Sequence, residues 1–417
     1  MSDAGCASSV TLPARRRIAV FDMSVATDSP AGSCVLAEVQ GLAKRFDVTV
    51  FSDRFDRGAM GMVDFIRVRA PRRPVLLRYL VFHLFAPWHY LVWRLRAGRP
   101  DWVQATQGQL PGADICYAHF CHSAYLQTQW SQVTATGTRR WARWVVHAFN
   151  AWCETRAFAK AKVIVVPSVG LRAEIASRHA AYAHKLHVIS NPVDTGHFHR
   201  PAAFDREQER RARGFESSHV VLCFMALGDF DRKGLGLLLN ALEGASGAVR
   251  ARVRILVVGG QAGEVAQYSA IAHTLSLQGS VTFVGMQTDV RPHLWASDAF
   301  AFPSAYEIFS LAILQAAAAG LATLVSQGLY GADEFVVDGH NGWVVPRNVA
   351  AIRAWLERLP ADPVHLRPLG DAATAAVQAY GVGTFRERWV ALFNTLGANA
   401  MRGAAAATAA DRAAEQA

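Results

Sequence analysis

The sequence predicts an α/β protein built from two doubly wound parallel sheets, and three observations support this fold class. The chain has 417 residues, 52% of them hydrophobic, which is enough apolar material for two separate cores. Short β-rich apolar runs alternate with helical stretches, a pattern typical of parallel sheets that helices cover on both faces. A polar, charged segment at residues 192–218 interrupts the alternation and divides it into two series.

The first series predicts a Rossmann-like domain over residues 1–195. Arg17 is followed by the apolar run IAVFD, a loop that contains Gly32 and Ser33, a stretch at helical spacing, and the run DVTVFSD. The alternation returns after residue 160, where the runs KVIVVPS and KLHVISNP flank another helical stretch. This order of strand, helix and strand indicates parallel pairing.

The second series predicts another doubly wound domain over residues 196–383, with the boundary near residue 196. Five β-rich runs alternate with helices there, namely HVVLCFMALGDF, RILVVGG, SVTFVG, DAFAFPS and LATLVS. The amphipathic segment 384–396 predicts a C-terminal helix that packs back toward the N-terminal domain. Residues 397–417 are rich in Ala and show no core-forming period, so we expect a disordered tail.

Charge and cysteine content narrow the partners and the compartment. The chain has 43 Lys and Arg against 33 Asp and Glu, which favours an anionic partner such as a nucleotide, a nucleic acid or a lipid headgroup. The six cysteines lack the CxxC pairs of structural zinc sites and are expected to be reduced thiols. The first 20 residues do not follow the order of a secretory signal, so we expect a cytoplasmic protein. The longest apolar run, residues 79–93, is shorter than the ~20 residues of a membrane-spanning helix.

In doubly wound sheets, ligands bind at the carboxyl ends of the strands, because helix N-termini and glycine-bearing loops present free N–H groups there. The first segment of this kind is ALGDFDRKGL, where Gly228 follows a predicted strand and Lys233-Gly234 begins a helix. Lys233 can reach a diphosphate as a point charge, and Gly234 allows close approach of the backbone.

Two further segments of the second half have the same position. After the run DAFAFPS, a short turn leads to an apolar helix predicted from Phe309 to Ala319, whose N-terminal N–H groups would attract phosphate. Glu307 precedes this helix and is suited to binding sugar hydroxyls. The third segment is the glycine-bearing loop from Gly328 to Gly331.

Together and in order, these segments resemble the donor domain of retaining glycosyltransferases of family 4, which have the GT-B fold of two Rossmann-like domains facing a cleft. That family has a Lys-Gly pair, an E-x7-E motif before a small-residue helix, and the pattern G…E.v.dg.nG.lv. Here these correspond to Lys233-Gly234, to Glu307 onward, and to residues 331–345. KLHVISNPVDTGHF and Gly32 add to the likeness, which covers most of residues 15–395 and is strongest in the second half.

The resemblance implies transfer of a hexose, with retention, from a UDP- or GDP-sugar to a saccharide or lipid-linked acceptor of the cell envelope. It implies no metal and no other cofactor, and it makes Lys233, Glu307 and His119 the catalytic residues. His119 follows a probable strand at residues 114–118, where family members carry a cleft histidine, and His122 is the alternative. The implied substrate-binding residues are Gly32, Gly228, Arg232, Gly234, Ile308, Phe309, Ser310, Leu311 and Gln315.

Two positions depart from the family pattern. Gln315 stands where the family has a second glutamate, and an amide offers one acceptor oxygen to the ribose hydroxyls instead of two. Asp229 stands where many members have an arginine, and Arg232 or another basic group is then needed to bind the diphosphate.

Two stretches indicate contact with an anionic membrane surface. Residues 71–100 contain six arginines and no acidic residue, with Trp and Tyr between them, and residues 139–146 repeat the mixture. The sequence therefore predicts a peripheral protein on the inner face of the plasma membrane. The alternative is a buried helix with an Arg-rich solvent edge.

Other functions remain open at this level. A GT-B epimerase or phosphorylase would share the fold, and a catalytically weakened partner protein would fit Gln315 and Asp229. Nucleic-acid binding has no recognition motif to support it, so nucleic acid is not an expected partner.

Overall fold

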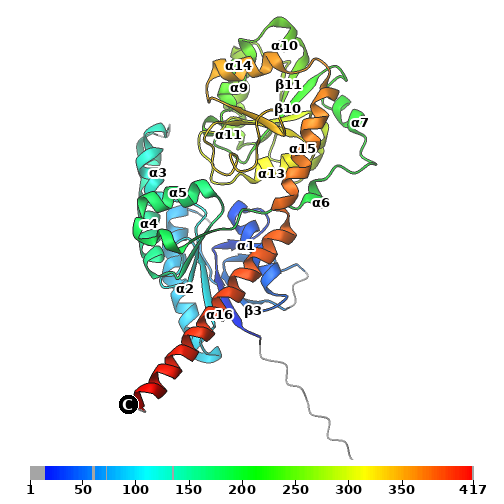
Figure 1. The fold of residues 1–417 in the computed structure, drawn as a ribbon. Helices are drawn as coiled ribbons and strands as arrows, with labels where there is room; N and C mark the ends of the chain where they lie inside the picture. The colour runs from blue at the N-terminus through cyan, green and yellow to red at the C-terminus, as the bar shows by residue number, and fades with distance from the viewer. Residues whose placement is uncertain (1–14, 59–61, 72, 134–135, 416–417) are drawn as a thin grey trace, which may run out of the picture. The chain divides into compact units, whose positions relative to one another are not determined.

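The computed structural model describes residues 15–58, 62–71, 73–133 and 136–415 (Figure 1). The described chain forms two compact units. The first lies within Met1–Tyr117, Gln132–Val163 and Trp389–Ala417, and the second within Ala118–Ser131 and Ile164–Arg388. Residues 1–14 lie outside the described residues. They include Cys6, and the expectation of no secretory signal rests mainly on them. Arg72, one of the six arginines of residues 71–100, also lies outside the described residues.

A seven-stranded parallel sheet forms from the first part of the chain. Its order is β5-β3-β1-β6-β7-β8-β9. The strands are β1 (Arg17–Phe21), β3 (Asp47–Ser52), β5 (Asp64–Arg67), β6 (Trp102–Thr106), β7 (Ile115–Tyr117), β8 (Val163–Val166) and β9 (Leu186–Val188). The short strands β2 (Ser24–Val25) and β4 (Arg54–Phe55) pair separately. The sequence prediction missed β5 and β6.

The helices of this part are α1 (Pro30–Leu42), α2 (Val75–Ala97), α3 (His122–Thr128), α4 (Gly137–Lys160) and α5 (Val169–Arg178). The prediction of a loop at Gly32 was wrong, because α1 already begins at Pro30, where a fixed φ suits the first helical position. Ser29 caps this helix, and its hydroxyl accepts a hydrogen bond from the Gly32 N–H at 3.3 Å. Gly32 therefore lies in the first turn of α1.

The helix α2 is longer than the apolar run that predicted it. It has 23 residues and continues through Pro87. Among the described residues it is the one helix that is long and apolar enough to cross a membrane by length and composition alone, so the prediction that this stretch is too short was wrong. Its Phe82 and Ala86, however, are fully buried in a core with Phe21 and Phe51.

A six-stranded parallel sheet forms from the second part of the chain, in the order β12-β11-β10-β13-β14-β15. The strands are β10 (Val220–Ala226), β11 (Val253–Gly259), β12 (Val281–Gly285), β13 (Ala299–Phe302), β14 (Ala322–Ser326) and β15 (Gly342–Val345). Five of these strands were predicted, and β15 is the sixth. Numbered along the chain, the order is that of dinucleotide-binding sheets, in which the chain reverses direction beside its first strand.

Helices of this second part cover the sheet (Figure 1). They are α8 (Phe230–Lys233), α9 (Leu235–Glu243), α10 (Gly247–Arg252), α11 (Ala262–Thr274), α12 (Arg291–Ala296), α13 (Leu311–Ala318), α14 (Val349–Arg358) and α15 (Arg367–Val377). All seven residues of β10 are buried, as a central parallel strand requires.

The polar segment at residues 192–218 is more firmly packed than its composition indicates. It contains α6 (Thr195–Phe198) and α7 (Arg206–Arg211). Arg210 is fully buried, and its guanidinium donates to the Asp298 carboxylate at 2.9 Å and to three backbone carbonyls. A buried charge is tolerated when it is paired and hydrogen-bonded in this way. The strands of the first sheet end at Val188 and those of the second begin at Val220, and the boundary at residue 195 stays a prediction.

The last helix, α16 (Val382–Glu415), has 34 residues. Trp389 is fully buried and its ring lies edge-on to Tyr117 at 4.9 Å, while the ring of Phe393 lies 5.8 Å from that of Phe46. The helix continues through residues 397–415, where the composition predicted a disordered tail. Alanine has the highest helix propensity of all residues, so an Ala-rich segment can extend a helix that tertiary contacts have already started.

Candidate donor-binding site

The predicted site residues of the second half lie at the point where the strand order reverses. Strand β10 is followed by the segment that contains Lys233, and β13, its neighbour in the sheet, is followed by the segment that contains Glu307. Helices leave neighbouring strands toward opposite faces at such a point, which opens a crevice for a ligand. Arg232 and Glu307, which are 75 positions apart in the sequence, thereby meet near the carboxyl ends of these two strands.

Gly234 allows the two segments to pack closely. Its φ is +86°, a left-handed conformation that favours glycine, and a Cβ atom there would lie 2.2 Å from the carbonyl oxygen of Pro303. Asp229 also has a left-handed backbone, with φ +63°, and Glu264 accepts a hydrogen bond from the N–H of Phe230 at 2.5 Å. Gly234 therefore lies against the backbone that follows β13, and its predicted contact with the substrate stays a prediction.

Lys233 and Glu307 form an ion pair at the centre of the site, in which the ammonium of Lys233 donates to Oε1 of Glu307. Nη1 of Arg232 donates to the same oxygen at 3.1 Å, and Oγ of Ser304 donates to it at 2.9 Å. The side chains of Lys233 and Glu307 are only 14% and 12% exposed. One carboxylate oxygen thus receives three donors, two of them cations.

The electrostatics of the two cations differ. Burial lowers the pKa of Lys233, and the negative charge of Glu307 offsets part of that effect. Burial acts to lower the pKa of Arg232 as well. The negative charges of Glu307 and Asp229 outweigh this effect, so the pKa of Arg232 is raised. Nε of Arg232 donates to the carboxylate of Asp229 at 2.7 Å. The aspartate that stands where many family members have an arginine thus binds the neighbouring Arg232.

The turn before α13 is held by remote residues. The helix begins at Leu311, two residues later than predicted, because Ser310 adopts an extended backbone as its N-cap. The prediction that the N–H of Phe309 belongs to the helix end was therefore wrong. The carbonyl of Phe309 accepts a hydrogen bond from Asn191 Nδ2 at 3.1 Å, and Ile308, Phe309 and Ser310 are all buried.

Gln315 lies in the second turn of α13 and is partly exposed. Within the described part of the chain, no hydrogen bond engages its side-chain amide. The amide is thus available to a ligand, which is compatible with the predicted contact to a ribose. Gly228 directly precedes Asp229, and a Cβ atom there would lie 3.2 Å from the Glu264 carboxylate.

A cavity of about 440 Å³ lies beside Glu307 within the second compact unit. Tyr306 is among its walls, and the hydroxyl of Tyr306 donates to Oε1 of Glu174 at 3.0 Å. Burial and this carboxylate raise the pKa of Tyr306 well above its usual range. The volume suits a small ligand with several polar contacts. The lining residues are Thr128, Gln129, Ala173, Glu174, Ser177, Ala305, Tyr306, Glu307, Gly328, Leu329 and Tyr330.

Sequence reasoning missed several residues that shape this region. Arg347 follows β15, and its guanidinium donates to the carbonyl of Pro303 at 3.1 Å and to that of Asp231 at 3.2 Å. Glu334 accepts the N–H of Val169, the first residue of α5, at 2.7 Å. No local pattern marks such residues, because their partners lie more than 40 positions away in the chain.

His119 follows β7, as predicted, but it is not among the residues that line the cavity. Burial lowers the pKa of His119 to about 3, so its imidazole is neutral at physiological pH. Gly32 has a packing role in the structure, since a Cβ atom there would lie 1.8 Å from the carbonyl oxygen of Ser24. The predicted substrate contacts of both residues stay predictions.

The first sheet also has a polar group where its strand order reverses, between β1 and β6. Asp22 directly follows β1, is 5% exposed, and accepts the N–H of Ser24 at 2.7 Å. Burial raises the pKa of Asp22 to about 6. Glu38 is fully buried and accepts from Gln104 Nε2 at 3.1 Å, and burial raises its pKa as well. The sequence prediction named none of these residues.

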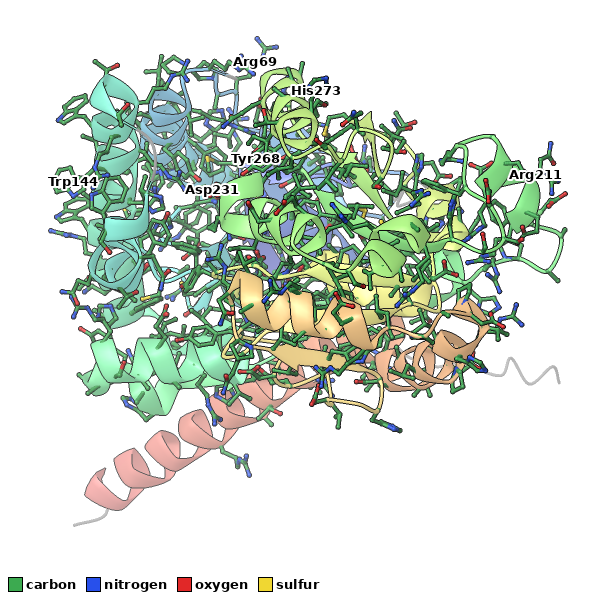
Figure 2. All side chains as sticks on the ribbon, turned by 90° about the horizontal axis from the view of Figure 1, so that it is seen from above. Arg69, Trp144, Arg211, Asp231, Tyr268 and His273 are labelled. Atoms are coloured by element: carbon green, nitrogen blue, oxygen red, sulfur yellow. The ribbon has the colours of Figure 1, made fainter. Side chains whose placement is uncertain are left out.

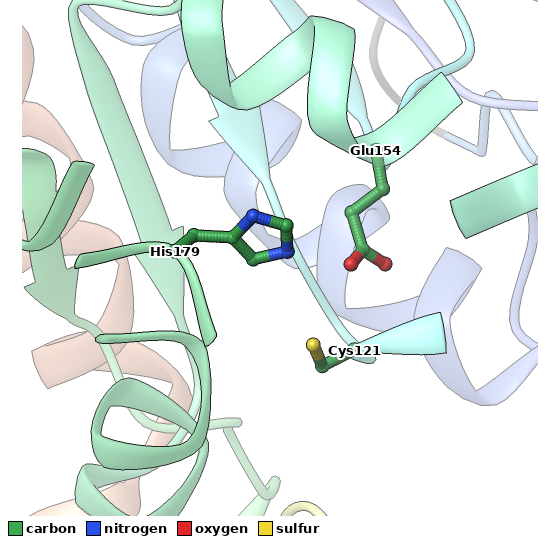
Figure 3. A group of neighbouring side chains, drawn as sticks. All are labelled: Cys121, Glu154 and His179. Atoms are coloured by element: carbon green, nitrogen blue, oxygen red, sulfur yellow. The ribbon is translucent and has the colours of Figure 1, made fainter. Parts of the chain in front are cut away.

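Figure 3 draws three side chains of types that bind metal ions, those of Cys121, Glu154 and His179. The ring of His179 already has a hydrogen bond with Ser123 Oγ at 3.1 Å, and Cys121 Sγ lies 3.4 Å from the same hydroxyl. Glu154 belongs to the first compact unit and the other two to the second, and we assign no metal site to them. Cys121 is buried and forms no disulfide.

The fold and the paired cations define a class of α/β proteins that bind phosphate-bearing ligands at the switch point of a Rossmann-like sheet. Comparison with known families agrees with this class. The family model of the glycosyl transferases group 1 matches residues 218–362, and that of glycosyltransferase family 4 matches residues 31–197. The chain belongs to this family of glycosyltransferases, so the resemblance seen in the motifs is confirmed.

Individual relatives are distant. The chain is 32% identical over 162 residues to the lipopolysaccharide core biosynthesis glycosyltransferase LpsE of Rhizobium meliloti, a match that covers 39% of this chain and spans only 43% of that relative. A sucrose-phosphate synthase from Thermosynechococcus elongatus has a similar structure, with a TM-score of 0.74, 19% identity and coverage of 92% and 100% of the two chains. Anabaena HepE in complex with UDP and glucose gives a TM-score of 0.66 and 18% identity over 91% and 100%. These structures confirm the predicted GT-B fold.

Proposed function

We propose that this protein transfers a hexosyl group, with retention of anomeric configuration, from a UDP- or GDP-sugar to a saccharide or lipid-linked acceptor of the cell envelope. The observation that carries the proposal is the convergence of Lys233 and Arg232 on Glu307 where the sheet order reverses. This arrangement supplies two cations and one carboxylate to a ligand that carries both phosphate and hydroxyl groups.

In the proposed reaction, the bond between the anomeric carbon and the diphosphate oxygen breaks, and a bond from that carbon to the acceptor oxygen forms. The acceptor proton passes to the departing phosphate. Lys233 and Arg232 stabilise the charge that grows on the leaving group, and the first N–H groups of α13 add to this field. Glu307 accepts hydrogen bonds from the sugar hydroxyls. Since these groups supply the positive charge, we propose that the reaction needs no metal.

His119 is proposed to contact the transferred sugar as a neutral imidazole, because its pKa lies far below physiological pH. Gly32, Gly228, Gly234 and the turn from Ile308 to Leu311 complete the proposed substrate contacts. Gln315 is proposed to bind the ribose through its single acceptor oxygen.

Two comparisons support the substrate classes. HepE, which has the same fold, is described in complex with UDP and glucose, and LpsE is described as an enzyme of lipopolysaccharide core synthesis. We propose by analogy a nucleotide-sugar donor and an envelope saccharide or lipid-linked acceptor. We also propose that the protein works in the cytoplasm, peripherally bound to the inner face of the plasma membrane.

The test is a screen of UDP- and GDP-sugars against free and lipid-linked saccharides, with nucleotide release as the readout and NMR of the new linkage. We expect turnover with at least one pair, the same anomeric configuration in donor and product, and unchanged rates in the presence of EDTA. The absence of nucleotide binding would instead favour a catalytically weakened partner protein that has lost the donor site, an alternative that the departures at Gln315 and Asp229 support. Conversion of the donor in the absence of an acceptor would favour an epimerase.

A further inference from the structure

The helix α2 has two apolar faces, and only one of them is used by the core. Tyr79, Phe82, Ala86, Tyr90 and Trp93 pack against the first sheet, where Tyr90 lies edge-on to Phe21 at 5.6 Å. A second stripe recurs every three or four residues on the opposite face of the helix. Its members are Leu77, Leu80, Leu84, Trp88, Leu91 and Leu95, which are 42% to 79% exposed.

The neighbouring helix α4 continues this exposed apolar surface. The two helices pack side by side, with the ring of His83 from α2 edge-on to Phe149 of α4 at 5.2 Å (Figure 1). Three tryptophans of α4 are exposed, and one of them, Trp144, projects from the outer side of its helix in Figure 2. They are Trp141, Trp144 and Trp152, at 66%, 47% and 55% exposure.

The exposed charges of these two helices are of one sign. The helix α2 contains no acidic residue, and the single acidic residue of α4, Glu154, is only 1% exposed. Exposed arginines lie on both helices, and Arg156 lies over the ring of Trp152 at 3.6 Å. The exposed cationic residues are Arg94, Arg96, Arg99, Arg139, Arg156 and Lys160.

We propose that this surface, the α2–α4 face, docks on an anionic lipid bilayer. It consists of the exposed leucines and tryptophan of α2, the three tryptophans of α4 and the six cationic residues. Leucine and tryptophan side chains enter the boundary between headgroups and acyl chains, while arginines bind the anionic headgroups. Tryptophan is among the residues most enriched at that boundary.

The structure distinguishes this mode of binding from two others. A helix that crossed the bilayer would expose Phe82 and Ala86 to lipid and remove them from the core, where both are fully buried. A second copy of the chain, docked by the same face around a twofold axis, would bring equal positive charges together. An anionic bilayer complements both the apolar stripe and the charge.

The inference rests on the proposed function and deepens it. A lipid-linked acceptor would reach the protein from the membrane, which gives the α2–α4 face a role in that function. Binding to lipid, however, is measured without catalysis. A failure of the docking face is therefore distinguishable from a failure of the glycosyl-transfer proposal.

The experiment is co-sedimentation of the full chain with vesicles of phosphatidylcholine alone and of phosphatidylcholine with phosphatidylglycerol. The test variant is Leu84→Glu with Trp88→Glu, since both residues are exposed and the substitutions add negative charge to the centre of the face. The matched control is Met286→Glu with Val364→Glu, two exposed apolar residues of the second compact unit. Circular dichroism and gel filtration of all three proteins check folding and oligomeric state.

We expect the wild type to sediment with the anionic vesicles, and the control variant to do the same. The partition coefficient of the test variant should fall by a factor of about 10 or more, because two apolar anchors are lost and two like charges are added. A wild type that sediments with neither vesicle, or a control variant that loses binding equally, overturns the proposal. A wild type that is dimeric and binds no lipid, with a monomeric test variant, overturns it in favour of an interface between copies.

Discussion

Lys233 and Glu307 are 74 positions apart in the sequence and form an ion pair near the carboxyl ends of strands β10 and β13. The pair is mostly buried, and Arg232 shares the same carboxylate oxygen. Under the proposed function, a diphosphate that binds here competes with Glu307 for both cations. The sugar hydroxyls can then take the acceptor oxygens that the cations release. In the proposed function, the pair therefore couples the binding of phosphate to the binding of the sugar.

The first prediction concerns this pair. Lys233→Ala should lower kcat/KM by about a hundredfold, since one preorganised charge contact to a leaving group contributes about 3 kcal/mol to the barrier. Glu307→Ala should also suppress turnover. The effect of the double variant should be smaller than the product of the two single effects, because the residues contact each other. Initial rates of nucleotide release measure all three, with Lys44→Ala, an exposed lysine of the first unit, as the control. Wild-type rates in both single variants would remove the site assignment.

A second prediction concerns the departure at Gln315. Gln315→Glu should tighten nucleotide binding by about tenfold, because hydrogen bonds to a charged acceptor contribute about 1 kcal/mol more than those to a neutral one. Isothermal calorimetry with UDP and GDP measures this change. The matched control is Gln378→Glu, which makes the same charge change at an exposed position of the same unit. Equal or weaker binding in Gln315→Glu would show that this side chain does not face the ribose.

The third prediction tests the packing that brings the two site segments together. Gly234→Ala should lower the free energy of unfolding by about 2 kcal/mol or more, because alanine is strained at φ +86° and its Cβ would collide with the carbonyl of Pro303. Thermal unfolding followed by circular dichroism measures the loss. Gly247→Ala is the control, since a Cβ at this first residue of α10 meets no atom within 4 Å. A melting temperature for Gly234→Ala that matches the control would contradict the close approach of Gly234 to Pro303.

The fourth prediction is a pH dependence that comes from Asp22. Its pKa is about 6 in the folded protein and about 4 when unfolded, so the neutral form is favoured by folding. The stability from this neutral carboxyl is fully present below about pH 4 and is lost as the pH rises to about 6. Asp22→Asn should therefore be more stable than the wild type at pH 7.5, by up to about 3 kcal/mol, and should match it near pH 4.

Melting temperatures of wild type and Asp22→Asn across pH 4 to 8 measure this difference. Asp64→Asn, which neutralises an exposed carboxylate on β5, is the control and should show no such divergence. Parallel pH curves for wild type and Asp22→Asn would rule out the burial effect.

The motifs of the second half could be predicted from the sequence because their signals are local. Lys233 ends α8 and Gly234 lies between α8 and α9, shortly after the buried strand β10, and Glu307 precedes a helix of small residues. Their places near strand ends therefore follow from the alternation alone. The two-sheet fold class was predicted for the same reason. The strands β5, β6 and β15 were missed because they are short or carry a buried polar residue such as Gln104.

The sequence by itself determined the periodicity of the elements, the excess of positive charge and the residue types of the site, since all of these depend on neighbours along the chain. Only the tertiary structure decided which of these residues meet. The pairing of Lys233 with Glu307 and the support of Pro303 by Arg347 depend on the strand order of the sheet. The two faces of α2 are both apolar, so composition could not show which one is buried. Packing of Phe82 against the first sheet settled that, because a helix can bury only the face that the sheet covers.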